Sequence, residues 1–204
     1  MLDYIQKGGI VMIPILACSV ISLTIILEKF YVLLTAGRNG RRLWASIQNL
    51  LRNGEWKDAL KFCQSQRNPG PIGRLVICNI ENREIDPETR KEELWALGSK
   101  EMDGLEKHLW FLSLIADVAP LLGLLGTVTG MVKCFMKIQE FGGMVDASLL
   151  AGGIWEALIT TVAGLSVAIP TMVAYHYLEK RVAEFSDFLK EVTTRVWLMA
   201  EKKG

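Results

Sequence analysis

Two runs without a charged residue, each 19 residues long, constrain this chain more than any other feature of its sequence. They extend from Gly9 to Leu27 and from Ala157 to Tyr175. A helix rises about 1.5 Å per residue, so helices of this length nearly match the hydrocarbon core of a bilayer, which is about 30 Å thick. A soluble domain of 204 residues would spread its 23 basic and 22 acidic side chains more evenly. The two runs therefore predict a membrane protein.

The sequence predicts three spans. The first apolar run is too long for the core of a signal peptide and has no small-x-small cleavage site before Glu28, so we expect it to be retained. A second stretch runs from Leu109 to Val132 and is interrupted only by Asp117. The third span extends from about Trp155 to Leu178. Three spans place the two termini on opposite sides of the membrane.

The basic residues predict which side each terminus occupies. One basic residue precedes the first span, two lie between the second and third spans, 13 lie in the segment Ala36–His108, and six follow Leu178. Loops rich in lysine and arginine stay in the cytoplasm. The chain is therefore expected to be a multi-pass membrane protein with its N-terminus outside and its C-terminus in the cytoplasm.

The predicted cytoplasmic segment has helical periodicity. Asn53-Gly54 interrupts one apolar pattern, and Asp86-Pro87-Glu88 has the proline and acids expected at a helix start. Nothing from Thr89 to His108 forces this helix to end, so we predict that the second span is the outer half of one long helix. The third span continues into an amphipathic run after Leu178, so two of the three transmembrane helices are predicted to extend into the cytoplasm.

These observations divide an all-α integral membrane protein into six parts. The predicted parts are an N-terminal segment with the first transmembrane helix (1–35), a cytoplasmic helical region (36–108), the second transmembrane helix (109–136), a periplasmic loop (137–154), the third transmembrane helix (155–178) and a cytoplasmic C-terminal helix (179–204).

Composition and motifs exclude several classes of function. The formal net charge of +1, with acids among the bases, argues against binding of nucleic acid. Four widely spaced cysteines and two histidines provide neither a disulfide framework nor a metal site. The segment Gly123–Gly130 lacks the Gly-Lys-Ser/Thr ending of a phosphate loop. We therefore predict no cofactor and no enzymatic activity, and any energy would come from an ion gradient.

The second and third spans each carry a face of small, polar or kinking residues. Such faces are usual where membrane helices pack, and Gly126-x-x-x-Gly130 is a packing motif. Packing is therefore one interpretation, and the wall of a polar path is the other. The faces comprise Ala116, Pro120, Gly123, Thr127, Gly130 and Cys134 on the second span, and Gly153, Ala157, Thr161, Gly164, Ala168 and Thr171 on the third, where Pro170 adds a second kinking residue.

Counting depth favours a polar path. If Val132 and Glu156 mark the outer interface, Thr127 and Thr161 each lie five residues inward, about 7.5 Å at 1.5 Å per residue. Two hydroxyls at the same depth are expected along a polar path, although a lone threonine more often bonds to its own helix.

Two carboxyls in or beside the spans need protein or water around them. On insertion scales each would cost about 2.5–3.5 kcal/mol at the centre of a helix in lipid. Asp117 and Thr171 each lie fifteen residues inward from those markers, which pairs a carboxyl with a hydroxyl near the inner face. Interfacial snorkelling is the simpler interpretation for Glu156, whereas only 15 uncharged residues separate Asp117 from Lys133.

Two motifs resemble a known family. Ala119-Pro-Leu-Leu-Gly-Leu-Leu-Gly-Thr-Val-Thr-Gly-Met131, followed by Gly153-Ile-Trp-Glu-Ala-Leu-Ile-Thr-Thr-Val-Ala-Gly-Leu-Ser-Val-Ala-Ile-Pro170, is similar to the paired signature of the ExbB/TolQ/MotA proton-channel family. The order of elements matches the ExbB/TolQ branch over the whole chain, whereas flagellar MotA has four spans.

The resemblance implies a location in the bacterial inner membrane, with the outer side of the chain in the periplasm, and it also implies an assembly and a function. In that family five copies surround the transmembrane helices of two copies of an ExbD- or TolR-like partner, whose membrane aspartate carries the proton. The complex uses the ion-motive force to do mechanical work on a TonB- or TolA-like protein. By position in the motifs, Thr127, Glu156 and Thr161 resemble the pore-lining polar residues.

Two departures from the family pattern accompany this resemblance. Asp117 stands where a neutral residue is expected, and Thr160 beside Thr161 leaves two candidates for the pore hydroxyl on the third span. The short chain and short N-terminus favour an ExbB-like system over a TolQ-like one. A non-conducting membrane scaffold is the alternative from a different class. The candidate path residues are Thr127, Thr161, Glu156, Thr160, Asp117 and Thr171, and the candidate packing residues are Gly123, Gly126, Gly130 and Gly164, with Pro120 and Pro170 as kinks.

Overall fold

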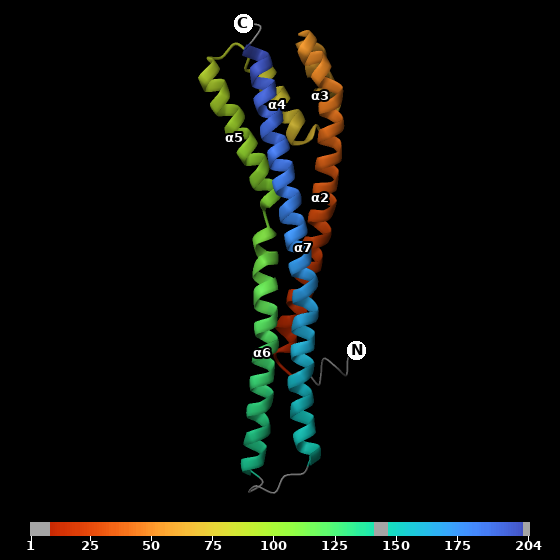
Figure 1. Ribbon diagram of the computed structural model, residues 1–204, viewed down its shortest axis with the longest axis vertical. Coiled ribbons are helices and arrows are strands. Elements are labelled where there is room, and N and C mark those ends of the chain that lie inside the picture. Colours follow the sequence, from red (N-terminus) through yellow and green to blue (C-terminus); the bar gives the residue numbers. More distant parts are fainter. Residues whose placement is uncertain (1–8, 141–146, 202–204) are drawn as a thin grey trace. The chain divides into compact units, whose positions relative to one another are not determined.

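A computed structural model describes residues 9–140 and 147–201, and every regular element within them is an α-helix (Figure 1). The prediction of an all-helical chain is confirmed. The helices are α2 (Met12–Asn53), α3 (Trp56–Ser65), α4 (Gly70–Glu81), α5 (Pro87–Glu106), α6 (Leu109–Glu140) and α7 (Ala147–Glu201).

Within the described residues, three helical stretches are long and apolar enough to cross a membrane, which agrees with the predicted number. They lie within Met12–Asn53, Pro87–Glu140 and Ala151–Ala200. Only 22–33% of the residues in their most apolar windows are buried inside the chain. Their apolar character therefore serves contacts outside the chain as well as the core, as expected of helices in lipid.

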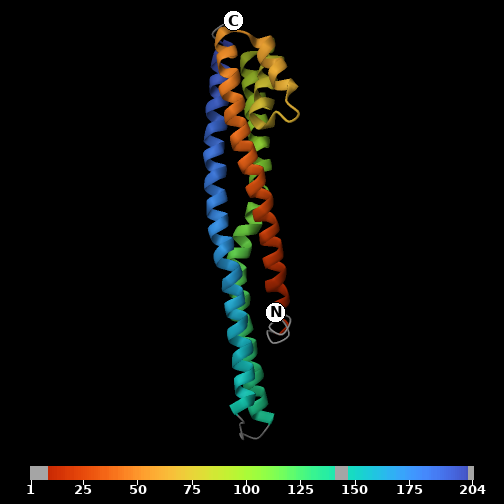
Figure 2. The same cartoon turned by 90° about the vertical axis from the view of Figure 1, so that its right-hand side faces the viewer.

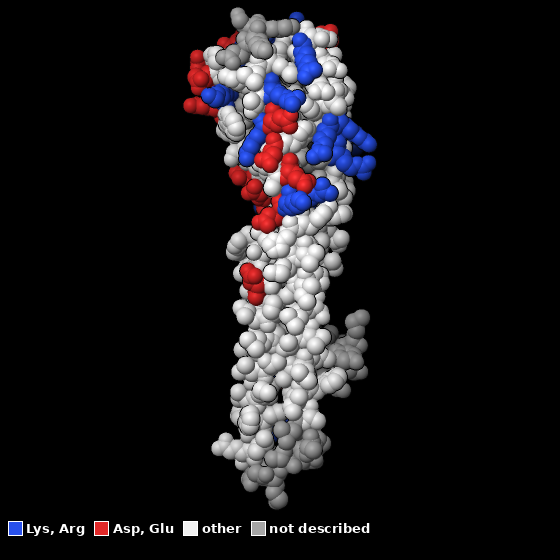
Figure 3. All heavy atoms as spheres, in the orientation of Figure 1, with Lys and Arg blue, Asp and Glu red and all other residues white. Residues whose placement is uncertain are grey.

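The chain forms two compact units. The first, here called the apolar unit, comprises Met1–Leu27 and His108–Tyr177, and the second, here called the charged unit, comprises Glu28–Lys107 and Leu178–Gly204. Charged side chains gather over the elements of the charged unit (Figure 3).

In the apolar unit, α6 lies beside the first part of α7 (Figures 1 and 2). Large aliphatic side chains are exposed on both helices. Soluble monomeric proteins rarely expose a contiguous apolar surface of this kind. An exterior of this kind is compatible with lipid. Exposed fractions are 62% for Leu121, 58% for Leu124, 62% for Val162, 60% for Ile169 and 66% for Val173.

In the charged unit, the short helix α4 packs against α3 and α5, and it also contacts α2 at Leu43 and α7 at Val196. Gly54 and Gly70 adopt φ values of +83° and +64°, which favour glycine, where the chain turns into α3 and α4. Helix α5 begins at Pro87, and the Asp86 carboxylate accepts the N–H of Thr89 at 3.2 Å. Fully buried core residues include Ile47, Leu51, Ala59, Cys63, Ile72, Val76, Leu94, Val192 and Val196.

The predicted long helix through the second span is interrupted, so the prediction of one continuous helix was wrong. Helix α5 ends at Glu106, α6 begins at Leu109, and His108 adopts a left-handed backbone with φ of 73°. The ammonium group of Lys29 donates to the carbonyl oxygens of Leu105 at 3.0 Å and Gly104 at 3.3 Å. It satisfies carbonyls that lose their helical partners at the interruption.

The helices also extend beyond the predicted spans. Helix α2 continues to Asn53, although the first part was predicted to end at 35. In the predicted periplasmic loop, 137–140 belong to α6 and 147–154 to α7. Residues 141–146 of that loop, residues 1–8 of the N-terminal segment and residues 202–204 of the C-terminal helix lie outside the described residues.

Candidate functional site

Small residues allow α6 and α7 to approach closely in the apolar unit. A Cβ at Gly164 would lie 2.6 Å from the carbonyl oxygen of Ala119, and a Cβ at Gly123 would lie 3.1 Å from that of Thr160. A Cβ at Gly126 would collide with the Thr160 hydroxyl. These contacts define a seam between the two helices, of the kind small residues form in membranes. Its buried members are Ala116, Ala119, Gly123, Gly126, Gly130 and Cys134 on α6, with Ala157, Thr160, Gly164, Ala168 and Thr171 on α7.

The two adjacent threonines of α7 have different surroundings. Thr160 is fully buried in the seam, and its hydroxyl donates to Ala157 of its own helix at 2.8 Å. Thr161 is partly exposed, and its hydroxyl donates to the carbonyl oxygen of Gly123 on α6 at 3.2 Å. Thr161 therefore joins the two helices by a hydrogen bond at the edge of the seam.

Thr127 on α6 is also partly exposed, outside the buried set of the seam. Its hydroxyl donates to the carbonyl oxygen of Leu124 on its own helix at 2.6 Å. A hydroxyl bonded in this way keeps its lone pairs available as an acceptor. The face predicted from 4-3 spacing is thus rotated slightly in the structure, with Ala119 and Gly126 buried in the seam and Thr127 at its edge.

Glu156 is held by a neighbouring helix. The Lys133 ammonium on α6 lies 2.5 Å from the Glu156 carboxylate on α7. The side chain of Glu156 is 23% exposed and that of Lys133 is 53% exposed. In the sequence, Lys133 stands out only because it ends the uncharged stretch that follows Asp117. A lysine and a carboxylate near the outer ends of two spans are the signal that could have suggested the pair.

Asp117 and Thr171 differ in exposure. Asp117 is exposed on α6, whereas Thr171 is 2% exposed and donates its hydroxyl to Val167 of its own helix at 2.7 Å. Thr171 therefore belongs to the packed interior of the apolar unit. Pro120 and Pro170 both lie inside their helices, α6 and α7.

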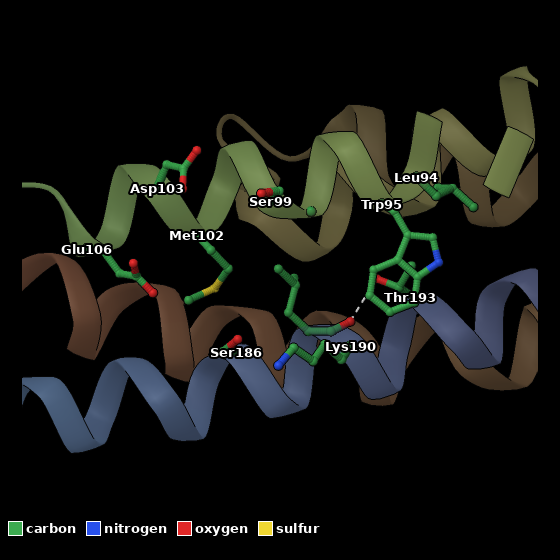
Figure 4. Close-up of a pocket in the computed structure, with 11 residues that line it drawn as sticks. Leu94, Trp95, Ser99, Met102, Asp103, Glu106, Ser186, Lys190 and Thr193 are labelled. Carbon is green, nitrogen blue, oxygen red and sulfur yellow. Dashed lines mark hydrogen bonds between the residues drawn. The ribbon is translucent and has the colours of Figure 1, made fainter. Parts of the chain in front are cut away.

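The charged unit carries a groove of about 270 Å³ between α5 and α7 (Figure 4). Trp95, which is 48% exposed, lies at one part of it, and the carboxyls of Asp103 and Glu106 lie at another. Leu94, Met102 and Leu189 add apolar surface. Within the part of the chain that the structure describes, no group of three or more His, Cys, Asp or Glu side chains is placed to hold a metal.

The chain matches the family model described as the MotA/TolQ/ExbB proton channel family over residues 67–191. It is 32% identical to "Putative biopolymer transport protein ExbB-like 1" of Synechocystis sp., over 98% of this chain and 78% of that protein. It is 31% identical to "Tol-Pal system protein TolQ" of Haemophilus influenzae, over 95% of this chain and 92% of that protein. It is 25% identical to "Biopolymer transport protein exbB1" of Vibrio cholerae, over 95% and 86%.

The match covers α4, α5, α6 and the part of α7 up to residue 191. The similarity to the ExbB-like and TolQ proteins extends over nearly the whole chain. Together with three helices able to span a membrane, these findings identify the chain as a multi-pass membrane protein of the MotA/TolQ/ExbB proton channel family, in its ExbB/TolQ branch.

Proposed function

We propose that this chain is the channel subunit of an ion-driven motor in the bacterial inner membrane. The motor couples the ion-motive force, carried by protons, to mechanical work on a partner that reaches across the periplasm. Membership of a proton channel family supports this proposal. The observation that carries it is the position of Thr161, whose hydroxyl lies at the edge of a tightly packed seam and bonds to the α6 backbone.

The ion path follows the edge of the seam. Thr127 and Thr161 provide hydroxyls at one predicted depth, Glu156 lies at the outer end, and Asp117 lies on an exposed position near the inner end. Threonine hydroxyls can hydrogen-bond an ion or a protonated acid, but they do not titrate near neutral pH. The titrating carboxyl therefore comes from a partner helix. It crosses the apolar part of the path in its neutral form and is ionised beside the hydroxyls.

Thr160 and Thr171 have a packing role in this proposal. Both are buried, and both donate their hydroxyls to carbonyl oxygens of α7 itself. Gly123, Gly126, Gly130 and Gly164 provide the close approach that the seam requires.

The working assembly is a homopentamer around two copies of a single-span ExbD- or TolR-like protein. The groove between α5 and α7 supports self-association, because a half-exposed tryptophan beside Leu94 and Met102 leaves apolar surface for a second copy to cover. We place the N-terminus in the periplasm and the C-terminus in the cytoplasm, as the distribution of basic residues predicts.

The external partner is a TonB-like protein that energises outer-membrane transport. The alternative partner is a TolA-like protein in an envelope-integrity system, and the 31% identity to TolQ supports that alternative. A deletion of the gene for this chain separates the two systems when two phenotypes are measured, the uptake of iron complexes and the sensitivity to detergents. Loss of uptake with normal detergent resistance is expected.

Ion flux tests the channel itself. Vesicles are prepared with this chain alone, with its ExbD/TolR-like partner, and with a partner whose membrane Asp is changed to Asn. Gradient-driven proton entry, followed with an internal pH-sensitive dye, is expected only in the second preparation. Equal flux in all three would place the proton carrier in this chain, with Glu156 or Asp117 as the candidates.

Valine substitutions separate a channel from a non-conducting scaffold. The hydrogen bonds of Thr127 and Thr160 to their own helices suit either function. Thr127→Val and Thr161→Val keep the shape and remove the hydroxyl. Thr161→Val also removes the hydrogen bond to Gly123 of α6, so Thr127→Val, which a scaffold would tolerate, is the sharper test. A channel is expected to lose at least tenfold in flux. Thr129→Val is the matched control, because the Thr129 hydroxyl bonds to its own helix two residues beyond Thr127.

A further inference from the structure

Three segments of the apolar unit meet at the Glu156 carboxylate. Lys133 reaches it from α6 at 2.5 Å, and Gly9 lies against it immediately before α2. We call Gly9, Lys133 and Glu156 the outer clasp. The Glu156 side chain is 23% exposed, so more than three-quarters of its surface is covered by its neighbours.

Gly9 is suited to this contact by its backbone and by its lack of a side chain. Its φ is +65°, which favours glycine, and its carbonyl oxygen accepts the N–H of Met12 at 3.2 Å in the first turn of α2. A Cβ at this position would collide with a carboxylate oxygen of Glu156 and would lie 3.5 Å from the Lys133 ammonium. The start of α2 therefore packs directly on the ion pair.

We propose that Lys133 is a positioning residue of the ion path, which holds the Glu156 carboxylate in one place at the outer end through their ion pair. This inference rests on the proposed channel function. It goes beyond that function because it assigns a role to a residue outside the small-residue faces. Glu156 then acts as a fixed and charge-compensated group, distinct from the mobile carboxyl that the partner helix brings.

The physical basis is the cost of a carboxylate beside lipid. An unpaired ionised group there has to draw water or move to the interface, and either response displaces it from the path. The Lys133 ammonium on α6 compensates the negative charge of the Glu156 carboxylate and holds the carboxylate within hydrogen-bond distance of itself. Arginine preserves both effects, whereas methionine keeps the length of the side chain and loses the charge.

Proton flux into vesicles that contain the chain and its partner tests the proposal. Lys133→Met is expected to lower flux at least fivefold, and Lys133→Arg to keep it within twofold of the wild type. Lys137→Met is the matched control, because Lys137 is exposed one helical turn further along α6. Wild-type flux in Lys133→Met would overturn the proposal.

Gly9→Ala tests the same clasp from α2. It is expected to lower flux to the same extent as Lys133→Met, because the added methyl group displaces the carboxylate. Gly152→Ala is its control, since a Cβ at Gly152 meets nothing within 4 Å. Full flux in Gly9→Ala would contradict the proposed contact.

A stability measurement separates failure of the clasp from failure of the channel. In detergent, Lys133→Met and Glu156→Gln are each expected to lower Tm, and the double variant to lower it no further than the larger single effect. Additive shifts would show that the two residues are not paired and would reject the inference. If wild-type vesicles with the partner carry no proton flux, the channel function fails, and the Tm cycle still decides whether the pair exists.

Discussion

The ammonium group of Lys29 donates to the carbonyl oxygen of Leu105 across 3.0 Å, at the end of α5. Lys29 is only 2% exposed, although lysine is almost never fully buried without a partner. The carbonyls of Gly104 and Leu105 would bond to N–H groups four residues ahead if the helix continued. It is interrupted at Lys107 and His108, and Lys29 donates to them instead.

We expect Lys29→Met to destabilise the chain by about 1–3 kcal/mol, because the buried carbonyl oxygen of Leu105 loses a charged donor. Thermal unfolding in detergent measures the effect as a lower Tm. Lys100→Met, at an exposed position of α5, is expected to leave Tm within error of the wild type. Equal Tm values for both variants would show that the Lys29 contacts contribute nothing.

Gly164→Ala is expected to weaken the seam between α6 and α7. The new methyl group would lie 2.6 Å from the Ala119 carbonyl oxygen and 3.1 Å from the Gly123 Cα, and backbone atoms cannot rotate away as a side chain can. Overpacking of this kind typically costs about 1–3 kcal/mol. Gly152→Ala, which adds its methyl group to open space, provides the comparison by Tm. A Gly164→Ala protein as stable as Gly152→Ala would argue against the seam.

The buried thiol of Cys63 is expected to make the thermal stability of the chain depend on pH. Burial raises the pKa of its thiol from 9.0 to about 11. The folded state favours the neutral thiol. The contribution of this thiol to the stability of the fold is therefore fully present below pH 9 and is lost as the pH rises through about 11. The difference in Tm between the wild type and Cys63→Ala is therefore expected to stay constant up to pH 9 and to shrink above it. A constant difference up to pH 11 would contradict this assignment.

The orientation in the membrane is tested by labelling with an impermeant thiol reagent. Cys63 is fully buried and is expected to react only after unfolding, so it is a poor probe. Ser65→Cys, introduced at an exposed position after Cys18, Cys63, Cys78 and Cys134 are changed to Ala, provides a better one. We expect labelling only after the membrane is opened. Labelling in intact spheroplasts would place this segment in the periplasm.

Asp117→Asn is expected to leave assembly intact and to lower proton flux at least twofold. The reason is that an exposed carboxylate near the inner end of the path attracts cations and water, whereas the amide has no charge. Asp187→Asn, at an exposed position on α7 in the charged unit, is the matched control. Equal flux in the wild type and Asp117→Asn would favour simple solvation of the carboxylate at the membrane interface.

The number of spans could be predicted from sequence because it depends on composition alone. A helix in lipid must be apolar over about 20 residues, and the charge-free runs around Ile21 and Val167 meet this condition without reference to any tertiary contact. The same reasoning predicted the start of α5, where Asp86 and Pro87 act through local geometry. Local signals therefore predicted most of the elements.

Features that depend on contacts distant in sequence could not be predicted in this way. No proline or glycine marks the interruption at Lys107 and His108, which is accompanied by hydrogen bonds from Lys29 on another helix. Thr160 and Thr161 both continue a spacing of three or four residues from Ala157, and only the packing of α6 assigns Thr160 to the seam. The partner of Glu156 likewise lies 23 residues away in sequence.

The close approach of α6 and α7 also determines where water can go. At Gly164 and Gly123 the space between the helices does not accept a methyl group without displacing backbone atoms, and a water molecule needs about as much room. The interior of the helix pair is therefore dry at this depth. In the proposed channel, a hydrated route for ions would therefore run over the outer surface of the pair, with this chain as one wall and neighbouring molecules as the others.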